Sequence, residues 1–296
     1  MDLSIRRAKE VVRRSWMQVM LFVMLILPFA IGLSLLVKST PFLNSDLFSL
    51  LLSDEWIPLQ GKFGLWPFIW SSIIISVLAL IIMVPVCLGA SIYITQFAPR
   101  WVSRALQTTI DILAGIPSVI FGLWGIVAII PMVGNIATVF GASNTSGYSI
   151  LAGAIVVAVS VMPFVLNMLI ELFRSVPVEL KEASLSLGTS YWQMIRDVIL
   201  RKLRPGITAS FTLGVSKAFG ETIAVVMVVG NVVQVPGSLF DAGYPLPALL
   251  ANNYGEMMSI PMYEAALMLC ALILLVIVIA FNYGAHRVIR YYHNQL

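Results

Sequence analysis

Six long apolar segments constrain the fold of this chain more than any other feature of its sequence. They lie at about residues 17–37, 69–95, 106–130, 150–170, 207–230 and 262–284. Each has the length of about 20 residues that an α-helix needs to cross the hydrocarbon core of a bilayer. Unpaired backbone groups are too costly in lipid, so such segments must be helical. The sequence therefore predicts an all-α membrane protein with six transmembrane helices.

Composition agrees with membrane insertion and argues against several function classes. Hydrophobic residues make up 59% of the chain and charged residues 11%, and the mean hydropathy is +0.96, whereas soluble proteins average about 25% charged residues. The net charge of +4 does not indicate nucleic-acid binding, because the basic residues lie in loops between apolar segments. Cys87 and Cys270 lie in apolar segments and are interpreted as packing residues. We expect no catalytic residues, no metal site and no cofactor in this chain.

The distribution of basic residues predicts the orientation. All but three of the 18 Lys and Arg residues fall on the side that holds both termini, which the positive-inside rule makes cytoplasmic. The exceptions are Lys38 and Lys62, on the other side, and Lys217, within the fifth segment. The basic N-terminus resembles the start of a secretory signal, but residues 17–37 exceed the 7 to 15 or so apolar residues of a signal core. We interpret this run as a retained first span.

Two loops on the predicted external side have distinct compositions. Residues 131–149 are rich in Gly, Asn, Ser and Thr, which typically break helices, and are predicted to connect spans 3 and 4. Residues 231–261 contain several prolines and a short apolar piece. That piece either dips back into the membrane or covers the outer mouth of the bundle, and the cover is the favoured interpretation.

A charged loop at residues 174–205 separates spans 4 and 5, and its pattern predicts two short helices. Ser175 and Pro177 favour a helix start, and Gly188 favours its end. Thr189 or Ser190 is expected to cap the second helix. The apolar stripes expected on the two helices comprise Leu180, Ala183 and Leu187, and then Trp192, Ile195 and Ile199, with Pro205 just beyond the second end. The predicted helices are too short to cross a bilayer and suit docking to a soluble partner.

Within this loop, the segment EASLSLG at Glu182–Gly188, followed by Val198 and Leu200, resembles the EAA loop of ABC importer permeases. Val198 stands where that family usually has Ile, and Arg201 where it usually has Pro. The resemblance implies that this EAA loop (174–205) docks into a groove of a separate ATPase subunit. The residues expected to couple the two subunits are Glu179, Glu182, Ala183 and Gly188.

The chain itself lacks a nucleotide-binding loop. A P-loop requires GxxxxGK followed by Ser or Thr, whereas Gly61-Lys62 is followed by Phe63 and has Trp56 in place of the first Gly. The chain is therefore not expected to be an enzyme, and ATP and Mg are expected at the partner ATPase.

Span 5 contains Lys217 and, four residues later, Glu221. A charge at the bilayer centre costs about 2.5 to 3.5 kcal/mol on insertion scales, so such residues usually face a bundle interior or a water-filled path. The alternative is an i,i+4 ion pair, which contributes only about 0.2 to 0.5 kcal/mol and is weaker in the Lys-before-Glu order. We interpret Lys217, Glu221 and Thr222 as part of the substrate path. An ammonium attracts an oxyanion, and a carboxylate accepts a hydrogen bond only from an oxyanion that is still protonated, as phosphate is and sulfate is not.

Several motifs from about Trp56 to the C-terminus resemble the phosphate-specific permeases of the PstC type. They are FGLWPFI before span 2, PVCLGASIYITQFAP in span 2, LAGIPSVIFGLWG in span 3 and GET in span 5. The resemblance implies a type I ABC importer permease fold and transport of inorganic phosphate by alternating access. It also implies a prokaryotic inner-membrane location, a second homologous permease in a heterodimer, two ATPase subunits and an extracytoplasmic phosphate-binding protein. Acidic outer segments at residues 46–56 and 241–256 are candidate contacts for that binding protein.

The resemblance and the spans together suggest how the chain is divided. Residues 1–65 are predicted to hold the N-terminal segment, first span and external loop, residues 66–290 the permease domain, and residues 291–296 a tail. Pro85, Gly115 and Pro117 interrupt helices and either form part of a gate or improve packing. Asp111, one turn before Gly115, is interpreted as an interfacial or capping residue, and Gly122 and Gly125 are expected to permit close helix approach.

Two other functions would explain some of the same sequence features. A permease for sulfate or molybdate would have the same spans and the same EAA loop. An ion-coupled secondary transporter or channel would explain the spans and Lys217 with Glu221, but not the EAA loop. A membrane enzyme fits poorly, because no His, Cys or Asp constellation has catalytic spacing.

Overall fold

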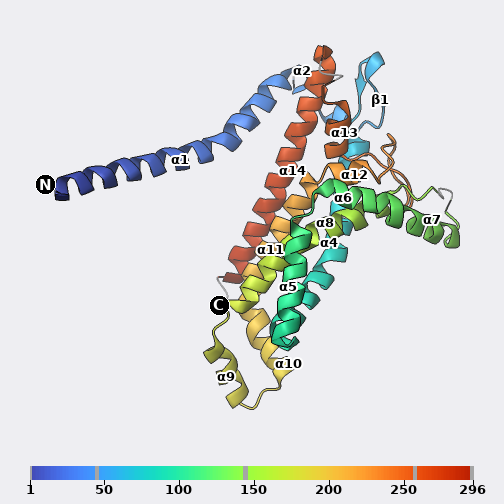
Figure 1. Ribbon diagram of the computed structural model, residues 1–296. Coiled ribbons are helices and arrows are strands. Elements are labelled where there is room, and N and C mark those ends of the chain that lie inside the picture. Colours follow the sequence, from blue (N-terminus) through green and yellow to red (C-terminus); the bar gives the residue numbers. More distant parts are fainter. Residues whose placement is uncertain (1, 44–46, 143–145, 256–258, 294–296) are drawn as a thin grey trace.

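The computed structural model describes residues 2–43, 47–142, 146–255 and 259–293, and it is almost entirely helical (Figure 1). The first part contains α1 (Asp2–Lys38), α2 (Thr40–Leu43), α3 (Leu47–Leu52), β1 (Trp56–Ile57), η1 (Pro58–Gln60), β2 (Lys62–Phe63), α4 (Trp66–Ile92) and η2 (Tyr93–Phe97). The middle contains α5 (Arg100–Ala114), α6 (Ser118–Trp124), η3 (Gly125–Ile129), α7 (Ile130–Val139) and α8 (Ile150–Arg174). The last part contains α9 (Val178–Ser186), α10 (Tyr191–Gln193), η4 (Met194–Ile199), α11 (Leu200–Gly220), α12 (Ile223–Val226), α13 (Leu246–Asn253) and α14 (Pro261–His293).

Five helical segments are long and apolar enough to cross a membrane. They are Arg13–Lys38, Trp66–Phe97, Ser118–Val139, Ile150–Arg174 and Pro261–Gly284. Four correspond to predicted spans 1, 2, 4 and 6. The fifth predicted span, residues 207–230, falls on α11 and α12, which are separate helices. A count of six spans therefore stays a prediction.

Predicted span 3 differs most from the structure. Residues 106–130 do not form one helix: α5 ends at Ala114, and a new apolar helical segment runs from Ser118 to Val139. Part of the predicted loop at 131–149 is therefore helical, as α7. The expectation was wrong because Gly134, Asn135 and Thr138 were treated as helix breakers, whereas packing overrides weak local propensity. Gly134 is buried in α7.

Helix α8 lies at the centre of the bundle. Ser149 caps its start by accepting a hydrogen bond from the backbone N–H of Ala152, at 3.2 Å. The helix packs against α4, α5, α6, α7, α11 and α12. Its contact with α11 is close, because a Cβ at Gly214 would lie 2.6 Å from Val165. The core is therefore built around α8, and the other spans differ in how much of their surface they bury.

Helix α1, in contrast to α8, buries little of its surface within the chain. It leaves the bundle near α2 and projects away from it (Figure 1). Its large side chains are exposed along the span, including Phe22 and Phe29, and its main contact within the chain is with α14. An apolar helix with so little cover needs lipid or another protein around it.

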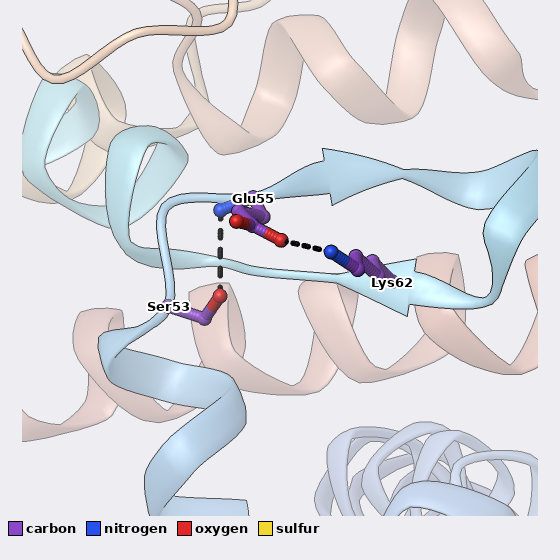
Figure 2. Close-up of polar contacts among 3 residues, drawn as sticks. All are labelled: Ser53, Glu55 and Lys62. Carbon is purple, nitrogen blue, oxygen red and sulfur yellow. Dashed lines mark hydrogen bonds and ion pairs between the residues drawn. The ribbon is translucent and has the colours of Figure 1, made fainter.

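The end of the bundle opposite the EAA loop carries a short antiparallel hairpin of β1 and β2 and the short helix α13 (Figure 1). Figure 2 shows the hairpin's polar contacts: Lys62 and Glu55 form an ion pair at 2.5 Å, and the Glu55 backbone N–H donates to Ser53 at 3.3 Å. Trp56 and Phe63 pack edge-to-face with ring centroids 5.4 Å apart. The hairpin therefore has an apolar inner face and a charged outer one.

Helix α13 packs into the same end. Its Leu246 and Leu249 are fully buried, and the Leu246 backbone N–H donates to Ser72 of α4 at 2.8 Å. The helix contacts α4, α12 and α14. Residues 246–253 thus pack among three helices, and the cover interpretation of this piece stays a prediction.

Candidate functional site

The fifth predicted span breaks at the residues predicted to contact substrate. Helix α11 ends at Gly220, and Glu221 adopts an extended conformation (φ −71°, ψ 115°) before α12 begins at Ile223. Lys217 therefore lies in the last turn of α11, where a cation interacts favourably with the helix dipole. Thr222 donates its hydroxyl to the Gly220 carbonyl at 3.1 Å. The break leaves Lys217, Glu221 and Thr222 at an interruption in the helix.

The ion-pair interpretation of Lys217 and Glu221 is not supported. In the described part of the chain, ion pairs join Lys38 to Glu264, Lys62 to Glu55 and Arg196 to Asp197, and none joins Lys217 to Glu221. The Lys217 ammonium instead lies 4.9 Å from the centroid of the Phe164 ring on α8. Lys217 is exposed and Glu221 is half-buried. The arrangement leaves both charged groups available to a ligand.

A second helix break faces the first. The Gly115 N–H bonds to the carbonyls of Asp111 and Ile112 at the end of α5, and Pro117 immediately precedes α6. Helix α6 then packs against α12, so closely that a Cβ at Gly122 would lie 2.6 Å from Met227. The close approach expected of Gly122 is confirmed. The segments that follow the two breaks are therefore in direct contact.

Gly125 and the predicted kink at Pro85 have different outcomes in the structure. A Cβ at Gly125 would lie 2.7 Å from Val156 and 2.8 Å from Val228, so this glycine also permits close packing. Helix α4, in contrast, continues through Pro85 without a break. Of the predicted kink sites, Gly115 and Pro117 thus lie at a break between helices, and Pro85 does not.

The EAA loop forms two helices joined by a tight turn. Helix α9 starts after Pro177, and the chain turns at Gly188, which adopts a left-handed conformation (φ +79°) as predicted. Ser190 rather than Thr189 caps the second helix. Its hydroxyl accepts from the Gln193 N–H at 3.2 Å, and the Gln193 side chain accepts from the Ser190 N–H at 2.8 Å.

Three details of the predicted loop were wrong. Ser175 ends α8 instead of starting α9, and donates to the Leu172 carbonyl. The second helix does not stop before Pro205 but continues through η4 into α11, with Pro205 inside α11. The apolar stripes are also incomplete, since Leu187 and Trp192 are 84% and 54% exposed. Local periodicity could not distinguish residues that pack inside the chain from residues that face outward.

The exposed surface of the EAA loop combines apolar and acidic groups. Glu179, Glu182 and Ala183 are exposed, beside the exposed apolar side chains Val178, Leu185, Leu187, Tyr191 and Trp192. A contiguous patch of this kind on a short pair of helices is typical of an interaction surface. The loop's inner face is fixed by Met194, Ile195 and Ile199, which are fully buried in the core.

Gln96, which the sequence analysis did not single out, links the EAA loop to the spans. Its side chain accepts a hydrogen bond from Lys181 of α9 at 3.1 Å. Its backbone carbonyl accepts one from the Tyr191 hydroxyl at 2.7 Å, and the rings of Phe97 and Tyr191 lie 5.5 Å apart. Both halves of the loop therefore contact the junction between α4 and α5, a contact that no local sequence signal indicated.

Asp111 and Asn167 form another contact that the sequence did not reveal. Asn167 of α8 donates to the Asp111 carboxylate of α5 at 3.0 Å. The Asp111 carboxylate thus contacts α8, and its interpretation as an interfacial or capping residue stays a prediction. The described residues contain no group of three His, Cys, Asp or Glu placed to hold a metal ion.

Comparison with known proteins places the chain among transport permeases. A family model described as "Binding-protein-dependent transport system inner membrane component" matches residues 86–290. The chain is 33% identical over 246 residues to the phosphate transport system permease protein PstC of Xylella fastidiosa (strain 9a5c), an alignment that covers 78% of this chain and 75% of the relative. It is 32% identical over 262 residues to PstC of Haemophilus influenzae, covering 84% and 82%.

Solved structures share the fold at low sequence identity. A bacterial alginate ABC transporter in complex with a periplasmic protein has a chain that matches with a TM-score of 0.64 and 14% identity, covering 96% of each chain. A chain of the inward-facing MetNI methionine ABC transporter matches with a TM-score of 0.60 and 19% identity, covering 80% of this chain and 99% of its own. The predicted type I ABC importer permease fold is confirmed.

The family match includes the helix breaks, Lys217 with Glu221, and the whole EAA loop. The chain therefore belongs to the family of inner membrane components of binding-protein-dependent transport systems.

Proposed function

We propose that this chain is the permease subunit that moves inorganic phosphate into the cell in an ATP-driven ABC importer. The observation that carries the proposal is the exposed ammonium of Lys217 and the carboxylate of Glu221 on either side of a helix break. The relatives named PstC, at 32% and 33% identity, support phosphate over other oxyanions. Permeases for sulfate or molybdate are the competing function within the same fold.

The chemistry of the pair suits a partly protonated oxyanion. The Lys217 ammonium attracts the anion, and the Glu221 carboxylate accepts a hydrogen bond from a P–OH group, which sulfate cannot donate. Lysine is a compact point charge without the bidentate fork of arginine. The site therefore holds phosphate weakly enough to release it.

The EAA loop supplies the coupling to ATP. Its exposed apolar and acidic surface, with Glu179, Glu182, Ala183 and Gly188, docks into an ATPase subunit that binds ATP and Mg. Closure of two such subunits moves the loop, and the contacts of Lys181 and Tyr191 with Gln96 pass that movement to α4 and α5. The spans then alternate between inward and outward access.

The proposal also includes the orientation of the chain, a second permease and a binding protein. The basic loops place both termini and the EAA loop in the cytoplasm of a prokaryotic cell, with the protein in the inner membrane. A second, homologous permease completes the path as a heterodimer. A phosphate-binding protein docks at the end that carries the β1–β2 hairpin and α13. Of the acidic residues suggested for that contact, Asp46 and Glu256 lie outside the described residues.

Uptake by the reconstituted importer tests the proposal. Vesicles containing both permeases, the ATPase and the binding protein should accumulate labelled phosphate when supplied with ATP, and excess sulfate or molybdate should not compete. Glu221→Gln should reduce phosphate uptake by about tenfold or more, because one hydrogen bond to a charged group contributes about 1.5 to 3 kcal/mol. Uptake of sulfate instead of phosphate would establish the competing permease, and uptake driven by an ion gradient without ATP would establish a secondary transporter.

A further inference from the structure

Helix α5 has a polar face along its whole length. With the helical repeat of 3.6 residues, one side of the helix collects five polar side chains: Arg100, Arg104, Gln107, Thr108 and Asp111. The apolar residues Leu106 and Leu113 fall on the opposite side, whereas Ile112, four residues after Thr108, borders the polar face. The rotation of the helix is fixed by Ile110, which is buried against Ile94 and Ile170. The polar face is therefore a defined surface, and Arg104, Thr108 and Asp111 on it are exposed.

Contact between this polar face and lipid acyl chains would be energetically unfavourable. Helix α5 begins beside the EAA loop, and Asp111 lies about 16 Å further along it at 1.5 Å per residue. A hydrocarbon core is about 30 Å thick, so with Arg100 taken as the edge of that core Asp111 lies near its middle. A carboxylate there is costly unless it faces water or other polar groups. The polar face must therefore meet an aqueous space or polar groups of another subunit.

The partners of Asp111 indicate an aqueous path. Asn167 donates to the Asp111 carboxylate at 3.0 Å, and the Oδ1 atom of Asn167 is buried with no hydrogen-bond partner among the described residues. Phe164, which contacts the Lys217 ammonium, lies one turn from Asn167 on the same side of α8. Lys217 and Asp111 therefore contact neighbouring residues on one face of α8. On the Asp111 side, the Oδ1 atom of Asn167 can still accept a hydrogen bond.

We propose that the polar face of α5 lines the half of the substrate path that lies beside the EAA loop, and that Asp111 is a second acceptor site on that path for a protonated oxyanion. Asn167 is a positioning residue, because its amide holds the carboxylate toward the path. An oxyanion leaving Lys217 and Glu221 would donate its O–H to Asp111, and a fully deprotonated anion would be repelled. This inference deepens the proposed function and rests on it.

Thiol labelling tests whether the face is aqueous, without requiring transport. In the assembled importer, Thr108→Cys should react with a membrane-impermeant thiol reagent supplied from the EAA-loop side. Leu113→Cys is the matched control, since it is also exposed but lies on the opposite, apolar side of the helix. The two native cysteines are buried and should give little background. Failure of Thr108→Cys to react, or equal reaction of Leu113→Cys, would overturn the path.

Protection by ligand tests the acceptor role. Inorganic phosphate should slow the labelling of Thr108→Cys about tenfold, and sulfate at the same concentration should not. Adding Asp111→Asn should abolish the difference between the two anions, and Asn167→Ala should weaken phosphate protection without changing labelling in its absence. Labelling that phosphate never slows would overturn the acceptor role. Phosphate uptake by the unlabelled importer is measured in parallel, so that failure of this site is distinguished from failure of the proposed function.

Discussion

At the scale of single residues, the arrangement of Lys217 and Glu221 depends on the end of α11 at Gly220. Had the helix continued, Glu221 would lie one turn above Lys217, and the two charges would neutralise each other on one face. Because Glu221 is extended instead, the ammonium remains exposed over Phe164. The helix end therefore keeps the two charged groups from pairing with each other along one helix face.

Substitution of Lys217 tests this directly. Lys217→Gln should lower phosphate uptake by about 10- to 100-fold, because an interaction with a charged group contributes about 1.5 to 3 kcal/mol. Lys217→Arg keeps the charge and should retain most uptake, with tighter phosphate binding because arginine binds oxyanions in a bidentate manner. Labelled phosphate uptake in vesicles measures both.

The matched control is Lys38→Gln, which removes a lysine from an ion pair with Glu264, outside the hairpin and outside the segments proposed to contact the binding protein. A pair at the protein surface contributes at most about 1 kcal/mol, so this change should leave uptake unchanged. An uptake rate for Lys217→Gln equal to that of Lys38→Gln would show that the charge in the span does not contact the substrate.

At the scale of elements, glycines decide how closely the broken helices approach. Gly122→Ala should destabilise the protein by about 1 to 3 kcal/mol, since its Cβ would lie 2.6 Å from Met227 and 3.1 Å from Ala224 and overpacking has that cost. Thermal unfolding in detergent measures the change. Gly89→Ala is the control: no atom lies within 4 Å of its added Cβ, and alanine favours the helix by about 0.5 to 1 kcal/mol. Equal unfolding midpoints for the two variants would contradict the close packing of α6 on α12.

The EAA loop supports a prediction about coupling. Glu182→Lys should abolish ATP-driven uptake while the protein remains folded, because Glu182 is exposed and reversing its charge disturbs a docking surface. ATP hydrolysis and uptake, measured together in vesicles, should become uncoupled. Glu10→Lys, the same reversal at an exposed glutamate of α1 outside the EAA loop and outside the segments proposed to contact the binding protein, should have no effect on coupling. Normal coupled uptake by Glu182→Lys would disprove the role of this residue.

At the scale of the whole molecule, α1 stands apart from the bundle. Its span is exposed from Trp16 to Val37 apart from a few half-buried positions. The family works as an assembly, and a helix that contacts little of its own chain is available to a partner. We therefore expect α1 to contribute to assembly with the second permease more than to the stability of its own fold.

The double substitution Phe22→Ala and Phe29→Ala tests this. These side chains are 64% and 79% exposed, so the unfolding free energy of the isolated subunit should change by no more than about 0.5 kcal/mol. Recovery of the second permease in co-purification should fall. Phe68→Ala, in contrast, removes a fully buried ring and should cost about 3 to 5 kcal/mol. A large loss of stability in the double variant would place α1 inside the fold.

The features that could be predicted from sequence are local in origin. Hydropathy placed spans 1, 2, 4 and 6, because the cost of exposing polar backbone to lipid depends on each segment alone. Gly188 was correctly expected to end a helix, and Ser190 was one of two residues expected to start the next, since such effects act within a turn. The chemistry of Lys217 and Glu221 was also evident, because any charge in an apolar segment is conspicuous.

Tertiary packing decided the rest. Asn167 and Asp111 are 56 residues apart in sequence, and Lys181 and Gln96 are 85 apart, so no local pattern links them. The break after Gly220 and the helix at Ile130–Val139 likewise depend on neighbours that oppose weak local propensities. The sequence by itself determined that the chain spans a membrane and which groups carry charge inside it. Only the packing of α5, α8 and α11 decided which neighbours those groups contact, because side-chain contacts depend on helix rotation, which hydropathy does not set.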